Sequence, residues 1–352
     1  MKVCHIISGL KSGGAEGVLY RLVSLNKNNS HFIISLTKGG FYSKKFEREK
    51  INFIELSFTG LNLKSFFNFL KLIIIILKKK PDIVQTWMYH ADLIGSIAAR
   101  LAGVSKVYWN IRNSNLNLEW SKKTTLVVMK LCAYLSNFLP TKIVCCSNKS
   151  LECHKSYGYD YKRMILILNG YDINKFNYRI STNLKLRNLF LIKKNEIVLG
   201  FVARWSRQKN FELILKSFSI SISNNSNLRL ILIGKNITNK NILLVKKLFR
   251  YKIYNKTILI NETDKLNEIL NIIDIGLFAS KGNEGFPNVI AEKMLMGIPI
   301  ISNEVGDAKM IIKNFGVVKK NLNYFELSRL INKYAQNYSL KKKKITYIID
   351  ML

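Results

Sequence analysis

The amino-acid sequence predicts an α/β protein built from two doubly wound domains. The chain has 352 residues, more than one hydrophobic core usually serves, so two domains of ordinary size are expected. Apolar residues make up 48% of the chain, which is enough to bury two cores. Short apolar runs typical of buried strands alternate with helical segments, and this alternation predicts parallel sheets with helices on both faces.

The first half of the chain begins with a predicted strand, a glycine-rich turn and a helix. The strand is Val3 to Ile7, the turn Ser8 to Gly14, and the helix Glu16 to Leu25. The alternation then repeats, with Gly103 ending one of the helices. Further strands are predicted at Phe32 to Leu36, Asn52 to Leu56, Pro81 to Trp87, Val107 to Asn110 and Lys142 to Cys146, and further helices at Leu63 to Lys79 and Ala91 to Ala102.

A second series of alternating strands and helices follows the Asn169-Gly170 turn and a polar stretch, Asn174 to Lys194. This stretch has no clear periodicity. We predict a first domain over residues 1–170, a linker over 171–194, a second domain over 195–330 and a helical tail over 331–352. A ligand is expected at the carboxyl ends of the strands, in a cleft between the two halves. The strands are predicted at Ile197 to Ala203, Leu228 to Gly234, Thr257 to Ile260, Ile275 to Phe278 and Pro299 to Ser302, and the main helices at Phe211 to Ile220 and Asn288 to Met296.

The charge balance is strongly basic. Fifty-six Lys and Arg residues against 22 Asp and Glu give a formal net charge of +34. This excess favours polyanionic partners, namely nucleic acid, anionic lipid or a phosphorylated substrate, although the lysines are spread along the chain as on an ordinary solvated surface. No RNP-like, helix-turn-helix or zinc-finger pattern is present, so nucleic acid is not the expected partner.

The cysteines and the apolar segments bear on cellular location. Five cysteines, an odd number without CxxC spacing, suggest neither a disulfide framework nor a zinc site. The N-terminus is not a signal peptide, and the most apolar segment, Phe66 to Leu77, is shorter than the roughly 20 residues that span a bilayer. We therefore expect a cytoplasmic protein without a transmembrane helix. The apolar segment is interpreted mainly as a helix packed on its sheet, with membrane docking as the alternative.

Two glycine- or cation-bearing turns follow predicted strands. Gly13 and Gly14 open a helix, where free N–H groups favour an anion and glycines let the backbone come close. This turn is not a G-x-G-x-x-G or a P-loop motif, and it could equally serve only a tight turn. Arg204 and Lys209 follow the strand at Ile197 to Ala203, and such cations suit contacts with a diphosphate.

The segment richest in candidate site residues begins with a loop carboxylate, Glu284. A predicted helix that carries Glu292 follows it. A helix beginning near Pro287 would point its first amides at a phosphate, and Glu292 would lie one turn after Asn288. Two such carboxylates can hydrogen-bond two sets of hydroxyls on one extended ligand. A hydrolytic acid and base pair is the rival interpretation, but the amides between them favour binding. His90 follows the Pro81 to Trp87 strand and could orient a substrate group or serve structure alone.

These motifs resemble those of retaining glycosyltransferase family 4, the glycosyl transferases group 1. The resemblance runs from Val3 to about Ile312. It implies the GT-B fold, with two facing Rossmann-like domains and an interdomain cleft. It is carried by Gly13-Gly14-Ala15-Glu16, His90-Ala-Asp92, Ile165 to Asp172, Arg204 with Lys209, and Glu284-Gly-Phe-Pro-Asn288 with Glu292.

The resemblance also implies roles for these residues. Arg204 and Lys209 would neutralise the diphosphate of a nucleotide-sugar donor without a metal or other cofactor, and Glu292 would bind the ribose. Glu284 would contact the donor sugar, with His90 close to it. Glu16 would face the acceptor, a lipid-linked or growing oligosaccharide of lipopolysaccharide or capsule. The remaining donor contacts would come from Gly13, Gly14, Gly285, Phe286, Pro287 and Asn288.

The family implies transfer with retention by same-face attack and requires no protein nucleophile. Domain closure would exclude water. Many relatives work on lipid-linked glycans, and the basic charge suits peripheral contact with an anionic inner leaflet. Three alternatives stay open: a noncatalytic basic protein that binds membrane or nucleic acid, a nucleotide-sugar epimerase of the same fold, and a phosphorylase.

Overall fold

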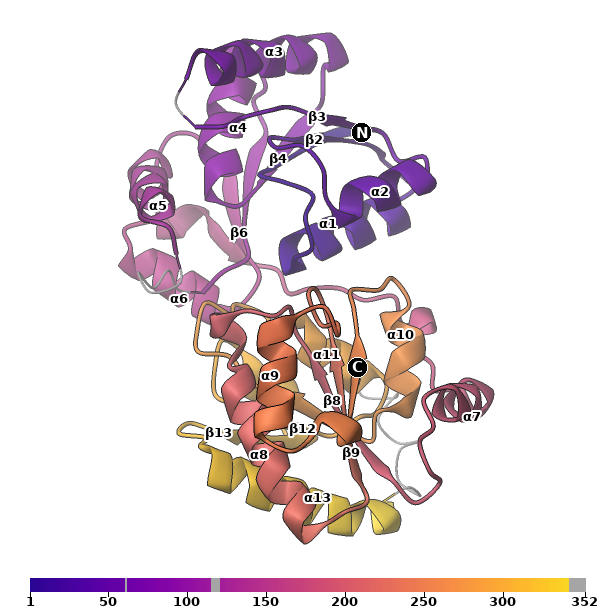
Figure 1. Cartoon of the computed structure of the whole chain (residues 1–352). Coiled ribbons are helices and arrows are strands. Elements are labelled where there is room, and N and C mark those ends of the chain that lie inside the picture. The colour runs from indigo at the N-terminus through magenta and orange to yellow at the C-terminus, as the bar shows by residue number, and fades with distance from the viewer. Residues whose placement is uncertain (61, 115–120, 342–352) are drawn as a thin grey trace. The chain divides into compact units, whose positions relative to one another are not determined.

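The computed structural model describes residues 1–60, 62–114 and 121–341 (Figure 1). The chain divides into two compact units. Unit 1 contains Met1–Tyr171 together with Asn283–Phe286, and unit 2 contains Asp172–Gly282 and Pro287–Leu352. Residues 342–352, the end of the predicted helical tail, lie outside the described residues. Within the described part of the chain, every helix is too short or too polar to cross a bilayer.

Unit 1 contains a parallel sheet of seven strands in the order β3-β2-β1-β4-β5-β6-β7. Its central strand, β1, pairs Val3 with His31 of β2 on one side and with Ile83 of β4 on the other. Five of the six residues of β1 are buried, as expected for a strand covered on both faces. The strands are β1 (Lys2–Ile7), β2 (Ser30–Ser35), β3 (Phe53–Glu55), β4 (Ile83–Trp87), β5 (Val107–Ile111), β6 (Lys142–Cys145) and β7 (Met164–Leu166).

Helices cover both faces of this sheet. Leu19 of α1 and Phe46 of α2 pack with Trp87 in one apolar cluster. On the other face, Leu72 of α3, Ala98 of α4 and Cys132 of α5 share a second cluster with the strands. The helices are α1 (Gly14–Leu25), α2 (Phe41–Arg48), α3 (Leu63–Lys79), α4 (Tyr89–Leu101), α5 (Lys123–Leu135) and α6 (Asn148–Ser156), followed by the 3₁₀ turn η1 (Tyr161–Arg163).

Unit 2 contains a parallel sheet of six strands in the order β10-β9-β8-β11-β12-β13. The β8 strand pairs along its whole length with β9, from Ile197 opposite Leu228 to Val202 opposite Ile233. These strands are nearly continuous apolar runs, which explains their burial between two helix layers. The strands are β8 (Ile197–Val202), β9 (Leu228–Ile233), β10 (Thr257–Ile260), β11 (Ile275–Phe278), β12 (Ile300–Asn303) and β13 (Gly316–Lys319).

The helices of unit 2 also form two layers. Phe218 of α8 and Leu248 of α9 lie in one core cluster with Leu327 of α13, while Ile290 of α11 packs with Ile312 of α12 in another. The α-helices are α7 (Ile180–Leu189), α8 (Phe211–Asn224), α9 (Ile242–Arg250), α10 (Leu266–Ile269), α11 (Asn288–Leu295), α12 (Ala308–Ile312) and α13 (Tyr324–Lys341). The 3₁₀ turns are η2 (Ile173–Lys175), η3 (Arg207–Lys209), η4 (Tyr254–Lys256) and η5 (Leu270–Ile272).

The segment at the start of unit 2 is more regular than the sequence suggested. The stretch expected as a linker contains α7, which is held by an ion pair of 2.9 Å between Arg187 and buried Asp274. Residues 331–341 of the predicted tail belong to α13, which packs in the core through Leu327 and Ile331. The predicted α/β class, with two doubly wound sheets, is confirmed.

Candidate functional site

In each sheet the direction of strand addition reverses once, and the predicted site residues lie beside these reversals. The reversal falls between β1 and β4 in unit 1 and between β8 and β11 in unit 2. In open α/β sheets the loops at such a switch point diverge and leave a crevice at the carboxyl ends of the strands, where ligands bind. In unit 1, Gly13 follows β1 and His90 follows β4; in unit 2, Arg204 follows β8.

The glycine-rich turn of unit 1 shapes the N-terminus of α1. Gly13 is the N-cap residue and makes no side-chain capping bond, and Gly14 is the first helical residue. The carboxylate of Glu16 folds back over this end of the helix, so closely that a Cβ atom on Gly13 would collide with it. The helix dipole favours negative charge at this position. Glu16 therefore already places an anion where the sequence predicts anion binding.

His90 is the second residue of α4 and is half-buried. Burial lowers the pKa of its imidazole, and the nearby Lys122 ammonium lowers it further, so the ring is neutral at pH 7. Directly before the helix, Met88 has φ of 71° and ψ of 155°, a strained conformation for a residue with a side chain. Such strain often marks functional sites, and here it sets the start of the helix that carries His90.

Buried hydrogen bonds hold the first turn of α4 in place. The Tyr89 hydroxyl lies 2.8 Å from Nε2 of His154, and Nδ1 of His154 lies 2.7 Å from the carbonyl oxygen of Ser150. Tyr89 and His154 are both buried. With Nδ1 donating to Ser150, Nε2 accepts the Tyr89 proton, and burial lowers the pKa of His154 to about 4. This neutral pair fixes the residue next to His90.

Arg112 was missed by the sequence reasoning. It follows β5, one strand beyond β4, and its Nη1 donates to Oδ1 of Asn169 at 2.5 Å. Its guanidinium lies 5.0 Å from the centre of the Trp87 ring, and burial lowers its pKa. A cation at the carboxyl end of a strand is the signal that was applied to Arg204, but a lone arginine without a motif partner did not stand out.

The segment Asn283–Phe286 belongs to unit 1 and packs on the ends of β5 and β6. The Ser114 hydroxyl donates to the carbonyl oxygen of Glu284. A Cβ atom on Gly285 would lie 3.0 Å from the carbonyl oxygen of Arg112 and from Sγ of Cys146, so a glycine fits this contact best. The structure thus places Glu284, Gly285 and Phe286 beside Arg112, at the carboxyl ends of β5 and β6 in unit 1.

In unit 2, the two predicted cations lie in the loop after β8. Arg204 is exposed, and Nζ of half-buried Lys209 lies 5.9 Å from the ring centre of Phe278, the last residue of β11. Lys209 therefore spans the reversal between β8 and β11. Gly234, after β9, lies so close to the Ala203 carbonyl that a Cβ atom would clash with it, and its φ of +145° also favours glycine.

Hydrogen bonds tie the loops after β8 and β11 together. Gln208 donates from Nε2 to the carbonyl oxygen of Gly282 at 2.7 Å, and its own carbonyl oxygen accepts from the Lys281 amide at 2.8 Å. Ser280 is held in turn by Asn303, at the end of β12. These bonds fix the turn that carries Lys209 relative to the strand ends beside it.

Asn288 begins α11, and Pro287, its N-cap residue, makes no side-chain capping bond. Glu292 is half-buried one turn later. The next residue, Lys293, is fully buried and donates from Nζ to the Leu277 carbonyl oxygen at 2.8 Å. Burial lowers the pKa of Lys293 to about 7, against which the Glu292 charge raises it. The sequence reasoning missed Lys293 because its neighbours form an ordinary apolar helix face.

The predicted site residues thus divide between the two units. Unit 2 holds Arg204, Lys209, Pro287, Asn288 and Glu292, and unit 1 holds Gly13, Gly14, Glu16, His90, Glu284, Gly285 and Phe286.

The second half of the chain matches a known family profile. Residues 183–350 match the family profile described as Glycosyl transferases group 1. These residues form a group 1 glycosyltransferase domain. The match covers the loop of Arg204 and Lys209 as well as the helix of Glu292. The resemblance noted from the sequence is confirmed over these residues.

Two curated proteins that this chain resembles are named as glycosyltransferases. The chain is 24% identical over 348 residues to the capsular polysaccharide biosynthesis glycosyltransferase CapM of Staphylococcus aureus. This alignment covers 97% of the chain and 89% of CapM. The chain is also 26% identical over 258 residues to the UDP-Gal:alpha-D-GlcNAc-diphosphoundecaprenol alpha-1,3-galactosyltransferase of Escherichia coli. That alignment covers 72% of this chain and 65% of the galactosyltransferase.

A solved structure shares the fold of this chain. Anabaena HepE in complex with UDP aligns with a TM-score of 0.83 at 20% identity, over 99% of this chain and 93% of HepE. The expected GT-B fold is therefore confirmed.

Proposed function

We propose that this glycosyltransferase moves a hexose-type sugar, with retention of anomeric configuration, from a nucleotide diphosphate sugar to a lipid-linked or growing glycan. The product would belong to a surface polysaccharide such as capsule or lipopolysaccharide. The S. aureus relative named for capsular polysaccharide and the E. coli relative named for a diphosphoundecaprenol acceptor support this proposal. We propose a cytoplasmic location with peripheral contact at the inner face of the membrane.

The donor in this proposal is a UDP sugar. The E. coli relative is named for UDP-galactose, and the HepE structures hold UDP or UDP-glucose. Arg204 and Lys209 would bind the diphosphate, and Glu292 would accept hydrogen bonds from the ribose hydroxyls. Amides at the start of α11 would add contacts to phosphate oxygens, because the first N–H groups of a helix lack internal partners.

The proposed reaction breaks the bond between the anomeric carbon and the diphosphate oxygen. The acceptor oxygen forms its new bond to that carbon on the same face, and its proton passes to the departing diphosphate. Arg204 and Lys209 offset the negative charge that develops on the diphosphate, so the proposal requires no metal or other cofactor. His90 and Glu284 would orient the donor sugar, and Glu16 would face the acceptor.

One observation carries the donor side of this proposal. The hydrogen bonds of Gln208 with Gly282 and Lys281 join the loops on both sides of the unit 2 switch point. They hold Lys209 at the end of β11, where open α/β sheets bind their ligands. A cation fixed there is already oriented for a diphosphate, which lowers the entropic cost of binding.

The first test is isothermal titration with UDP, GDP, ADP and CMP. We expect one nucleoside diphosphate to bind, and Arg204→Ala and Glu292→Ala each to weaken its binding by tenfold or more. Arg250→Ala, which removes an exposed arginine at the end of α9, is the matched control and should bind normally. If the folded wild type bound none of the four, the transferase proposal would fall in favour of a noncatalytic basic protein.

A second experiment separates transfer from the other reactions of this fold. The protein is incubated with radiolabelled UDP sugar, with and without an undecaprenyl-diphosphate-linked saccharide. Transfer predicts label in the lipid fraction only when the acceptor is present. Conversion of the donor sugar without acceptor would indicate an epimerase, and a requirement for free phosphate would indicate a phosphorylase.

A further inference from the structure

The α3 helix turns an apolar stripe toward solvent. Its buried residues, Ser65, Leu72 and Ile76, face the sheet. Its exposed apolar residues lie on the opposite side within an arc of about 100°, the width of one helix face. They are Leu63, Phe66, Phe67, Leu70, Ile74 and Leu77, with exposed fractions between 39% and 72%. Packing on the sheet therefore explains only the inner face of this helix.

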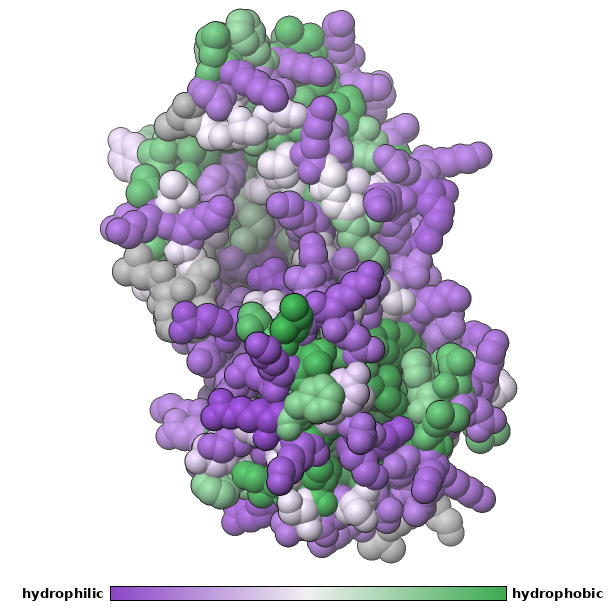
Figure 2. Space-filling view, in the orientation of Figure 1, coloured by the Kyte–Doolittle hydropathy of each residue, from purple (hydrophilic) through white to green (hydrophobic). Residues whose placement is uncertain are grey.

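A line of lysines borders the stripe. Lys64, Lys71 and Lys78 are exposed and follow one another at seven-residue spacing, so they lie along one side of the helix. Lys79 and Lys80 extend the charge at its C-terminal end, and α3 contains no acidic residue. Figure 2 shows hydrophobic side chains gathered over α3, at the top of the view, next to strongly hydrophilic ones. Apolar residues bordered by lysines are typical of helices that lie in a membrane interface.

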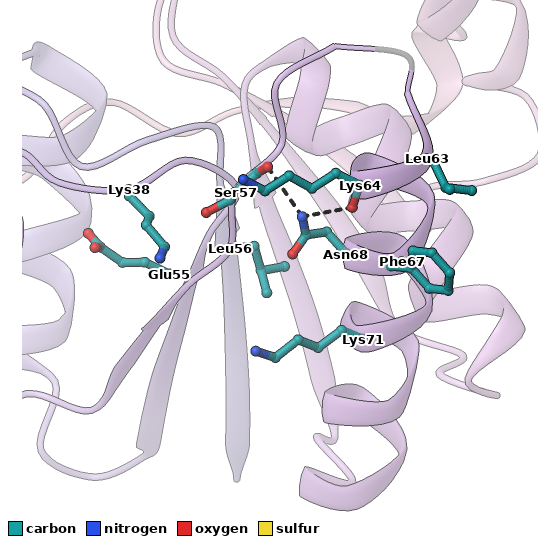
Figure 3. Close-up of a pocket in the computed structure, with 9 residues that line it drawn as sticks. All are labelled: Lys38, Glu55, Leu56, Ser57, Leu63, Lys64, Phe67, Asn68 and Lys71. Carbon is teal, nitrogen blue, oxygen red and sulfur yellow. Dashed lines mark hydrogen bonds between the residues drawn. The ribbon is translucent and has the colours of Figure 1, made fainter.

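A hollow beside the first turns of α3 adds a place for an anion. It has a volume of about 570 Å³ and lies between α3 and the end of β3. In Figure 3, Lys64 and Lys71 extend from α3 across this hollow, and Lys38 reaches it from the loop after β2. The acidic residue in the lining, Glu55, accepts hydrogen bonds from the Gly39 amide and the Ser43 hydroxyl.

We propose that α3 binds the surface of an anionic lipid bilayer, with its exposed apolar stripe between the lipid headgroups and its lysines on their phosphates. The lysine-lined hollow would take the phosphate of one headgroup. Charge complementarity selects this partner, because lysines follow one side of the exposed stripe, α3 contains no acidic residue, and the whole chain carries +34. The inference rests on the proposed function only in placing the acceptor in a membrane.

The test is co-sedimentation of the full chain with vesicles of phosphatidylcholine, with or without 30% phosphatidylglycerol. We expect strong binding only to the anionic vesicles. Phe66→Ser with Phe67→Ser should weaken this binding at least tenfold, because both exposed aromatic anchors are lost. Ile242→Ser with Leu243→Ser is the matched control, since these residues of α9 are 66% and 67% exposed and lie in unit 2. This control should bind as the wild type does.

Charge is tested separately. Replacement of Lys64, Lys71 and Lys78 by Gln should weaken anionic-vesicle binding by roughly a hundredfold, since each lysine near an anionic surface contributes about fivefold. Equal loss in the α9 control would indicate adhesion by general surface properties and would overturn the proposal. So would normal binding by the Phe66 and Phe67 variant. Titration with UDP on the same variants keeps the two proposals apart, because the α3 changes should leave nucleotide binding intact.

Discussion

Gln208 donates a hydrogen bond of 2.7 Å to the carbonyl oxygen of Gly282, across 74 residues of sequence. The bond joins the turn that carries Lys209 to the loop after β11. Gln208→Met keeps the side-chain length but removes the donor. We expect the KM for the donor sugar to rise by about tenfold, because a freed turn must be ordered at each binding event.

The melting temperature of this variant should change by only a few degrees, since Gln208 lies outside the hydrophobic core. Steady-state kinetics and thermal melts check the two expectations. An unchanged KM would mean that the backbone bond from the Lys281 amide suffices to hold the turn.

The buried Lys293 should lower the free energy of unfolding at neutral pH. Its folded pKa is about 7, below the ordinary 10.5, so the unfolded chain binds more protons between these values and the free energy of unfolding rises with pH. Lys293→Met should raise that free energy at pH 7 by roughly 1–3 kcal/mol and flatten its rise between pH 7 and pH 10. Urea unfolding at several pH values measures both, with exposed Lys246→Met as the control.

His154 should make the protein sensitive to acid. Burial lowers its pKa from 6.5 to about 4, so the unfolded chain takes up a proton that the folded chain resists, and stability falls as pH drops from 6.5 toward 4. His154→Gln should reduce this fall by about 1–3 kcal/mol. Tyr89→Phe removes the hydrogen bond but leaves the titration, so its pH profile should keep the wild-type slope. Equal slopes in all three proteins would contradict the prediction.

Glycine should be more stable than alanine at position 88, where Met88 has a positive φ. At φ of 71° and ψ of 155°, its backbone lies in a region that residues with a Cβ atom avoid. Met88→Gly and Met88→Ala both lose the side chain, so their difference isolates the backbone. We expect the glycine variant to be more stable by about 1–2 kcal/mol, the reverse of the usual order. Chemical denaturation of the pair tests this, and an alanine variant that is equally stable would show that the backbone relaxes.

Much of the fold could be predicted because its strands are continuous apolar runs. The predicted strands at Thr257 to Ile260 and Ile275 to Phe278 have the bounds observed for β10 and β11. Short polar helices were missed, because periodicity is weak in eight to ten residues. In α7, no residue is fully buried, and the ion pair of Arg187 with Asp274 helps to hold the helix. In α2, Phe46 is the one fully buried large side chain.

The site could be predicted only where a motif marked it. Arg204 and Lys209 stood out as a spaced pair, and Glu284 and Glu292 as an ordered motif; their roles stay predictions. Arg112 carries the same chemistry, but its environment comes from Trp87 and Asn169, which lie 25 and 57 residues away. The placement of Gly285 against Arg112 and Cys146 likewise depends on packing that no local spacing encodes.

The single reversal of strand order in each sheet places the predicted site residues near one end of the strands and leaves the other end without them. The predicted site residues lie in loops at the carboxyl ends of the strands or in the first two turns of the helices that follow these loops; the helical ones are Gly14, Glu16, His90, Asn288 and Glu292. The opposite turns only return the chain to the next strand, as at Gly103, where an added Cβ would meet nothing within 4 Å. A fluorophore attached next to Gly103, in the turn that leads to β5, would therefore not compete with a ligand bound at the carboxyl ends.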